Sequence, residues 1–209
     1  MRNIVAALTI KFDFNSKKGV AFLEALLQRV GGEFNYMALL KLAFFADRYH
    51  IRHYARPVSG DVYYAMKLGP VPSNLKDIID VQDYNKDNIV KSKEYFVKLQ
   101  SCNIDISQLS KSDIKAIDFA VEKFGNIGRD AFSIAELTHA YPEWNKYWAQ
   151  FEQNRNQRID MDYKDFLKNT EPNHIVFKKY NFIDPFVPLT ESERQTLIEE
   201  MEETSTLYG

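Results

Sequence analysis

The sequence predicts a mainly α-helical fold: a compact helical domain with a small antiparallel β-hairpin or sheet packed on the helices. Apolar residues recur at helical spacing over residues 17–30 and 36–54, and two short segments, 62–68 and 94–99, are typical of strands. The chain has 209 residues, of which 45% are hydrophobic and 27% are charged. This composition is ordinary for a globular protein with a substantial buried core.

The first two helices have clear boundary signals. The helix at 17–30 ends at Gly31 and Gly32. Its apolar face comprises Val20, Leu23, Leu27 and Val30. Asn35 is the expected N-cap of the second helix, over residues 36–54. The front half of that helix is apolar on nearly every side, which predicts a buried central helix.

The back half of the second helix is polar. Its polar residues are Asp47, Arg48, His50, Arg52 and His53. We therefore expect the helix to emerge from the core there. Arg56 precedes Pro57 and so avoids the helical region, which places the end of the helix before this pair.

A strand, a corner and a short helix follow. The strand at 62–68 leads into Gly69-Pro70-Val71-Pro72, a rigid corner because each proline restricts its own φ and the residue before it. Ser73 is the expected cap of a helix through residue 79. Residues 83–93 are polar and predict a loop. The strand at 94–99 is the expected partner of the first strand.

The remaining elements are predicted mostly from capping signals. Residues 110–113, 133–136 and 190–193 resemble capping boxes that open helices over 111–124, 133–139 and the C-terminal segment. Residues 143–151 predict a short helix, 162–167 one or two turns, and 175–179 an extended segment. Near the N-terminus, residues 4–10 are too short for a membrane span and lack a convincing signal-peptide cleavage region, so they predict a strand or a docked segment.

The charge and the cysteine content exclude several classes of function. A net charge of −2 lacks the positive surplus of a dedicated nucleic-acid binder. The single Cys102 rules out an intramolecular disulfide and fits a reducing, cytoplasmic compartment. It has no local histidine motif, and the chain lacks a glycine-rich phosphate loop. We therefore expect a protein that is not an enzyme and has no cofactor.

One metal-site alternative remains in the second helix. Asp47, His50 and His53 are spaced so that a carboxylate and two imidazoles could gather around a metal. Arg48 and Arg52 would repel a cation there, and ion pairs explain Asp47 better. We keep a small metal-dependent hydrolase as an alternative function and assign no metal ligand.

Three runs of sequence share the pattern of a known family. They are KLAFFADRYHIRHYARPVSGDVYYAMKLGPVPSNLKD at 41–77, LSKSDIKAIDFAVEKFG at 109–125 and FSIAELTHAYPEWNKYW at 132–148. Together they resemble the Panacea domain, also called the SocA-like antitoxin domain. The resemblance implies a mainly α-helical antitoxin, often encoded on a phage or mobile element, that binds a cognate toxin protein from an adjacent gene. It divides the chain into an N-terminal extension (1–16), a Panacea-like domain (17–169) and a C-terminal extension ending in a helix (170–209).

We expect the partner-binding surface at the exit of the second helix and at the corner. The candidate residues are Asp47, Arg48, His50, Tyr64, Lys67, Gly69, Pro70, Val71, Pro72 and Ser73. A stiff corner loses little freedom on binding, which favours an interface. Alternation along the strand sends half of its side chains into the core, which favours a structural role equally. A proteolytic adaptor or regulator that delivers its partner to a protease is a further alternative.

Overall fold

The computed structural model describes residues 10–80 and 88–208. The longer helices are α1 (Ser16–Arg29), α2 (Tyr36–Tyr54), α3 (Ser73–Asp80), α4 (Lys111–Phe124) and α9 (Glu191–Tyr208). The shorter helices are α5 (Ala131–Leu137), α6 (Pro142–Asn145), α7 (Trp148–Gln153) and α8 (Ile175–Lys179). Short 3-10 turns are η1 (Ile127–Arg129), η2 (Thr138–Ala140) and η3 (Tyr163–Leu167). The strands are β1 (Glu33–Asn35), β2 (Tyr63–Met66), β3 (Gly69–Pro72), β4 (Ile89–Lys93), β5 (Phe96–Leu99) and β6 (Ile159–Asp160). The mainly α-helical fold with small antiparallel sheets is confirmed.

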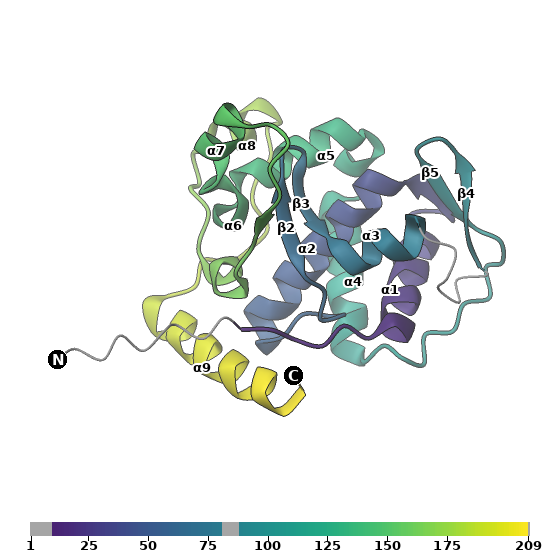
Figure 1. Ribbon diagram of the computed structural model, residues 1–209, viewed down its shortest axis with the longest axis horizontal. Coiled ribbons are helices and arrows are strands. Elements are labelled where there is room, and N and C mark those ends of the chain that lie inside the picture. The colour runs from purple at the N-terminus through teal and green to yellow at the C-terminus, as the bar shows by residue number, and fades with distance from the viewer. Residues whose placement is uncertain (1–9, 81–87, 209) are drawn as a thin grey trace.

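Helix α2 lies at the centre of the molecule, as Figure 1 shows. The side chain of Asn35 accepts hydrogen bonds from the backbone N–H of Met37 at 3.0 Å and of Ala38 at 3.3 Å, which confirms the predicted N-cap. The helix packs on α1, α4 and α5. Its apolar front half is buried as predicted, with Leu39 and Phe44 at 0% exposure.

Both ends of the described chain contribute to one hydrophobic core. That core includes Ile10 near the N-terminus and Met201 in α9. Helix α9 packs on α2 and η3 and runs along the lower left of the molecule in Figure 1. The predicted capping box at its start is confirmed, because the N–H of Glu193 donates to Thr190 Oγ1 and the N–H of Thr190 donates back to Glu193 Oε2.

The strands form two sheets, and this differs from the predicted pairing. In one, the order is β3-β2-β6; in the other, it is β1-β5-β4. The predicted pairing of the strand at 62–68 with the strand at 94–99 is therefore wrong. Strand β5 instead pairs with β1, which directly precedes α2, and with β4, in a segment predicted as a loop. Residues 83–87 of that predicted loop lie outside the described residues.

The predicted corner is itself a strand. Strand β3 pairs with β2 in an antiparallel hairpin, with Tyr64 opposite Val71. The N–H of Ser73 donates to Val62 O at 2.9 Å, which places the N–H groups of alternate residues toward β2. The backbone nitrogens of Pro70 and Pro72, which carry no hydrogen to donate, therefore point away from β2. Proline is tolerated here because β3 is an edge strand.

Three of the short segments also differ from prediction. Helix α5 begins earlier than expected because Asp130, not Ser133, caps it, accepting from the N–H of Phe132 at 3.1 Å. Residues 175–179 form α8 instead of an extended segment. Burial of Val176 and Phe177 at adjacent positions of this turn outweighs the local preference for a strand. The predicted 143–151 helix divides into α6 and α7.

None of the described helices is long and apolar enough to cross a membrane.

Candidate interaction surface

Four polar side chains in the back half of α2 are buried. Asp47, Arg48 and His50 are 0% exposed, and Arg52 is 5% exposed. The last turn of the helix does emerge from the core, with His53 and Tyr54 exposed. For the four buried side chains the prediction is wrong, and they are not part of the surface. The physical reason is that each of them meets polar partners from distant segments.

Arg48 is held by an ion pair and by backbone carbonyls. Its Nη1 donates to both carboxylate oxygens of Glu143, at 2.5 and 2.6 Å, and to Phe166 O at 3.0 Å. Its guanidinium also lies over the rings of Tyr141 and Phe186, at 4.8 and 5.0 Å from their centroids. Burial raises the pKa of Glu143, whereas the charge of Arg48 opposes this rise. These bonds, all from the one Nη1 group, tie α2 to α6 and η3.

Two buried carboxylates shape the segment that joins α2 to the hairpin. Asp47 accepts from the N–H of Val58 at 2.6 Å and from the hydroxyl of Tyr63 at 2.8 Å. Burial raises its pKa to about 7. Asp61 accepts from the N–H of Leu75 at 2.7 Å, and burial raises its pKa to about 6. Asp61, rather than Ser73, therefore caps α3.

The three residues of the metal-site alternative do not converge. His50 Nδ1 lies 2.7 Å from Arg56 O, and its Nε2 lies 3.2 Å from Asp113 Oδ1. Burial lowers the pKa of His50, which favours the neutral imidazole. His53 is exposed and bonds to a carbonyl of its own helix, while Asp47 is occupied by Val58 and Tyr63. Over residues 10–80 and 88–208, no three His, Cys, Asp or Glu side chains are placed to hold a metal ion.

The hairpin residues divide between buried and accessible. Lys67 is exposed, and Tyr64, Val71 and Ser73 are half-buried, whereas Gly69, Pro70 and Pro72 are buried. The guanidinium of Arg158 lies 3.4 Å from the ring centroid of Tyr64. Of the predicted surface, the accessible part is therefore the outer side of the hairpin and its turn.

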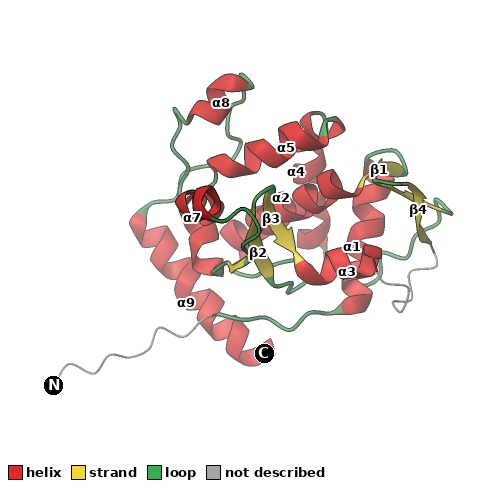
Figure 2. Ribbon diagram, turned by 45° about the horizontal axis from the view of Figure 1, so that its top comes forward, coloured by secondary structure: helices red, strands yellow, loops and turns green. Residues whose placement is uncertain are grey.

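A hollow of about 410 Å³ lies beside this turn, and we call it the hairpin hollow. It is lined by Tyr36, Met37, Leu40, Lys41, Met66, Lys67, Leu68, Val71, Lys76, Arg155, Asn156 and Gln157. Its volume is within the range of about 300–1,000 Å³ that is usual for ligand clefts. Figure 2 shows the sheet of β2 and β3 over α2, with α7, which precedes residues 155–157, beside it.

Most of this lining was missed by sequence reasoning. Lys67 and Val71 were predicted as surface residues, but Leu68 and Arg155 were not. Met66 and Leu68 are 37% and 44% exposed because the hairpin turn lies at the surface of the fold, and the local sequence does not specify that position. Arg155 belongs to a distant loop, and no local motif marks it.

Two hydrogen bonds and the close approach of Gly69 to Thr138 hold the hairpin turn in place. The buried Lys41 ammonium donates to Pro70 O at 2.7 Å, and burial lowers its pKa to about 7. The indole N–H of Trp144 donates to Met66 O at 2.8 Å. Gly69 has φ of +93°, and a Cβ added there would lie 2.2 Å from Thr138 Oγ1. The turn is therefore closely packed on the side that faces Lys41, Thr138 and Trp144, and the side chains of Met66 and Leu68 remain exposed.

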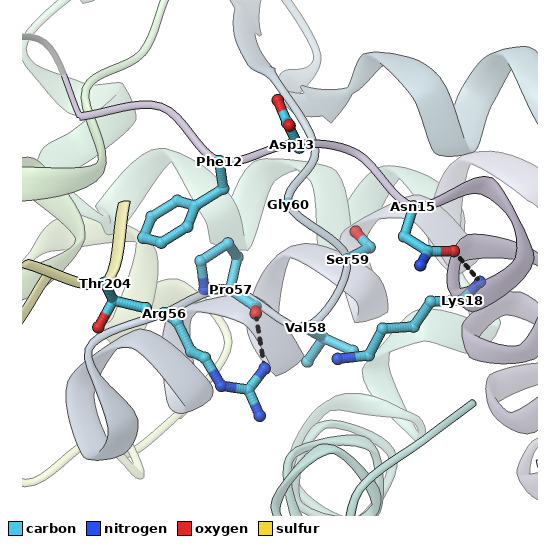
Figure 3. A pocket seen from close by; sticks show the side chains of 10 residues that line it. All are labelled: Phe12, Asp13, Asn15, Lys18, Arg56, Pro57, Val58, Ser59, Gly60 and Thr204. Atoms are coloured by element: carbon cyan, nitrogen blue, oxygen red, sulfur yellow. Dashed lines mark hydrogen bonds between the residues drawn. The ribbon is translucent and has the colours of Figure 1, made fainter. Parts of the chain in front are cut away.

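A second hollow, of about 380 Å³, lies between the N-terminal segment and α9 (Figure 3). The cations in its wall, Lys18 and Arg56, both pair with Asp113, at 2.9 and 3.4 Å. Burial disfavours the charge of Asp113, but hydrogen bonds from His50 and Lys18 hold its pKa below the usual range. The charges of this hollow are thus largely satisfied within the protein.

The comparisons with known proteins return one match. The family model "Antitoxin SocA-like, Panacea domain" matches residues 39–145, from the first turn of α2 to the end of α6. The matched region includes the whole β2–β3 hairpin. Neither the curated proteins nor the solved structures contain a match.

Proposed function

We propose that this chain, which belongs to the family of SocA-like antitoxins with a Panacea domain, neutralises a toxin protein by binding it directly. The hairpin turn and the hairpin hollow are its contact surface in this proposal. The buried residues Asp47, Arg48 and His50 are assigned to the scaffold beneath that surface, because a partner cannot reach them.

The observation that carries the proposal is an exposed apolar turn on a rigid base. Met66 and Leu68 are 37% and 44% exposed, and Lys67 between them is exposed as well. The backbone at this turn is anchored by hydrogen bonds from Trp144 and Lys41. Apolar anchors on a preorganised element lose little conformational freedom when a partner covers them, which is typical of protein interfaces.

The test is co-expression with the toxin encoded by the neighbouring gene, measuring growth and co-purification on a tag. Wild-type protein is expected to restore growth and to form a stable complex. Met66→Ser with Leu68→Ser should weaken both effects. The matched control is Ile175→Ser with Ile183→Ser, since these side chains are 76% and 89% exposed and lie outside the hairpin hollow.

Other outcomes would overturn the proposal. Restored growth without a complex would favour an adaptor that delivers the toxin to a protease. Equal loss of protection in the hairpin and control variants would remove the hairpin turn as the contact surface. Circular dichroism of each variant establishes that a loss is not caused by unfolding.

A further inference from the structure

The hairpin hollow combines an apolar wall with a charge of one sign. Its apolar lining comes from two sources, the first turns of α2 and the β2–β3 hairpin. These side chains are Tyr36, Met37, Leu40, Met66, Leu68 and Val71. Of the described residues that line the hollow, none is acidic, whereas four are lysine or arginine. A ligand that fills the hollow must therefore have apolar groups to contact the wall and negative charge to pair with the cations.

Two of these cations are available to a partner. Lys41 is buried and donates to Pro70 O, and Lys76 already pairs with Asp80 at 2.6 Å. Lys67 and Arg155 are exposed, and within the described part of the chain neither forms an ion pair. They come from the hairpin turn and from the loop after α7, so they present charge from two separate segments.

We infer that the hairpin hollow receives an acidic, apolar segment of the partner protein, with apolar side chains in the hollow and carboxylates against Lys67 and Arg155. This inference rests on the proposed function, because it identifies the chemistry of the toxin segment that is bound. Complementary charge at the rim sets orientation and excludes basic segments, while burial of apolar surface provides most of the affinity.

The lining favours a protein over a nucleic acid. Single-stranded nucleic acids are bound by positive grooves whose aromatic side chains stack on successive bases. The apolar part of the wall is otherwise aliphatic, and Tyr36 is the one aromatic side chain among the described residues that line the hollow.

The first experiment measures binding of labelled peptides of equal length by fluorescence anisotropy. The probes are an alternating Leu/Asp peptide, a Leu/Lys peptide, a Ser/Asp peptide and a single-stranded DNA oligomer. The Leu/Asp peptide is expected to bind at least tenfold more tightly than the others. Tighter or equal binding of any other probe, or no binding of the Leu/Asp peptide, would overturn the inference.

Charge-reversed variants locate the binding. Lys67→Glu with Arg155→Glu should weaken Leu/Asp binding about tenfold or more. Lys115→Glu with Lys178→Glu is the matched control, because both side chains are exposed and lie outside the hollow. Equal effects of the two double variants would refute the location.

The second experiment uses the toxin complex itself. Leu68 is replaced by the photoreactive amino acid p-benzoylphenylalanine, and the cross-linked toxin peptide is sequenced. A segment rich in carboxylates and apolar residues is expected; a basic or uncharged segment would contradict the inference while leaving toxin binding intact. Failure of the wild-type protein to form any complex would refute the proposed function instead, and the peptide measurement would still decide the chemistry of the hollow.

Discussion

Replacing Arg48 with methionine tests whether the polar half of α2 is a structural part of the core. The change leaves the carboxylate of Glu143, 0% exposed, without its cation. Removing one partner of a buried ion pair costs about 3–5 kcal/mol. The carbonyls of Phe166 and Lys168 keep hydrogen bonds from Arg52, at 3.3 and 3.2 Å, so they add little to this cost. We expect Arg48→Met to lower the free energy of unfolding by about 3–5 kcal/mol.

Urea unfolding followed by tryptophan fluorescence measures this change, since Trp144 is fully buried beside the same region. The expected loss is a large part of a typical total stability of about 5–15 kcal/mol. The double variant Arg48→Met with Glu143→Leu removes both members of the ion pair, so neither is left without the other. The double variant should therefore be more stable than the sum of the single changes predicts, by about 0.5–3 kcal/mol.

The control is the surface pair of Arg29 and Asp118, whose side chains are 23% and 56% exposed. Exposed pairs contribute about 0–1 kcal/mol, so Arg29→Met should have a small effect. The reasoning is refuted if Arg48→Met costs no more than Arg29→Met, or if the two changes at Arg48 and Glu143 simply add. Charge reversal at Arg48 is accordingly expected to unfold the protein and is unsuitable for mapping a partner surface.

Two further predictions concern the base of the hairpin. Burial lowers the pKa of Lys41 from 10.5 to about 7, so between these pH values the unfolded chain binds the extra proton and stability rises with pH, by at most about 1.4 kcal/mol per pH unit. Lys41→Met should flatten this rise, which urea unfolding at pH 7 and pH 9 measures; an unchanged slope would contradict the lowered pKa of the buried amine. Gly69→Ala should cost about 2–4 kcal/mol, from the positive φ and the contact with Thr138. Adding Thr138→Ala should recover part of that loss, and no recovery would show that the contact is unimportant.

Local features of the fold were predictable from the sequence because their causes lie within a few residues. The span of α2 followed from the Asn35 cap and from continuous apolar spacing. The reciprocal bonds of Ser110 with Asp113 also followed from adjacent residues, as the observed capping box before α4 confirms. The capping box before α5 was misplaced because Asp130, a stronger acceptor just upstream, competes with Ser133 for the same helix start.

The candidate site was predictable in part. The hairpin turn was singled out from its prolines and tyrosines, and Lys67 and Val71 do line the hairpin hollow. Its remaining wall comes from α2, α3 and the loop after α7, which only the folded chain brings to the turn. No local pattern in the sequence specifies such a meeting of distant segments.

By itself, the sequence determined the mainly α-helical class, the longer helices and where most of them begin, and which family the chain resembles. The tertiary structure decided which strands pair and which charged residues are buried. Asp47, Arg48 and His50 have the composition of a solvated helix face, yet their partners include the Tyr63 hydroxyl, the Glu143 carboxylate and the Asp113 carboxylate. A charged side chain is stable in the core only when such partners surround it. Because those partners arrive from distant parts of the chain, the burial of these residues is a property of the whole fold.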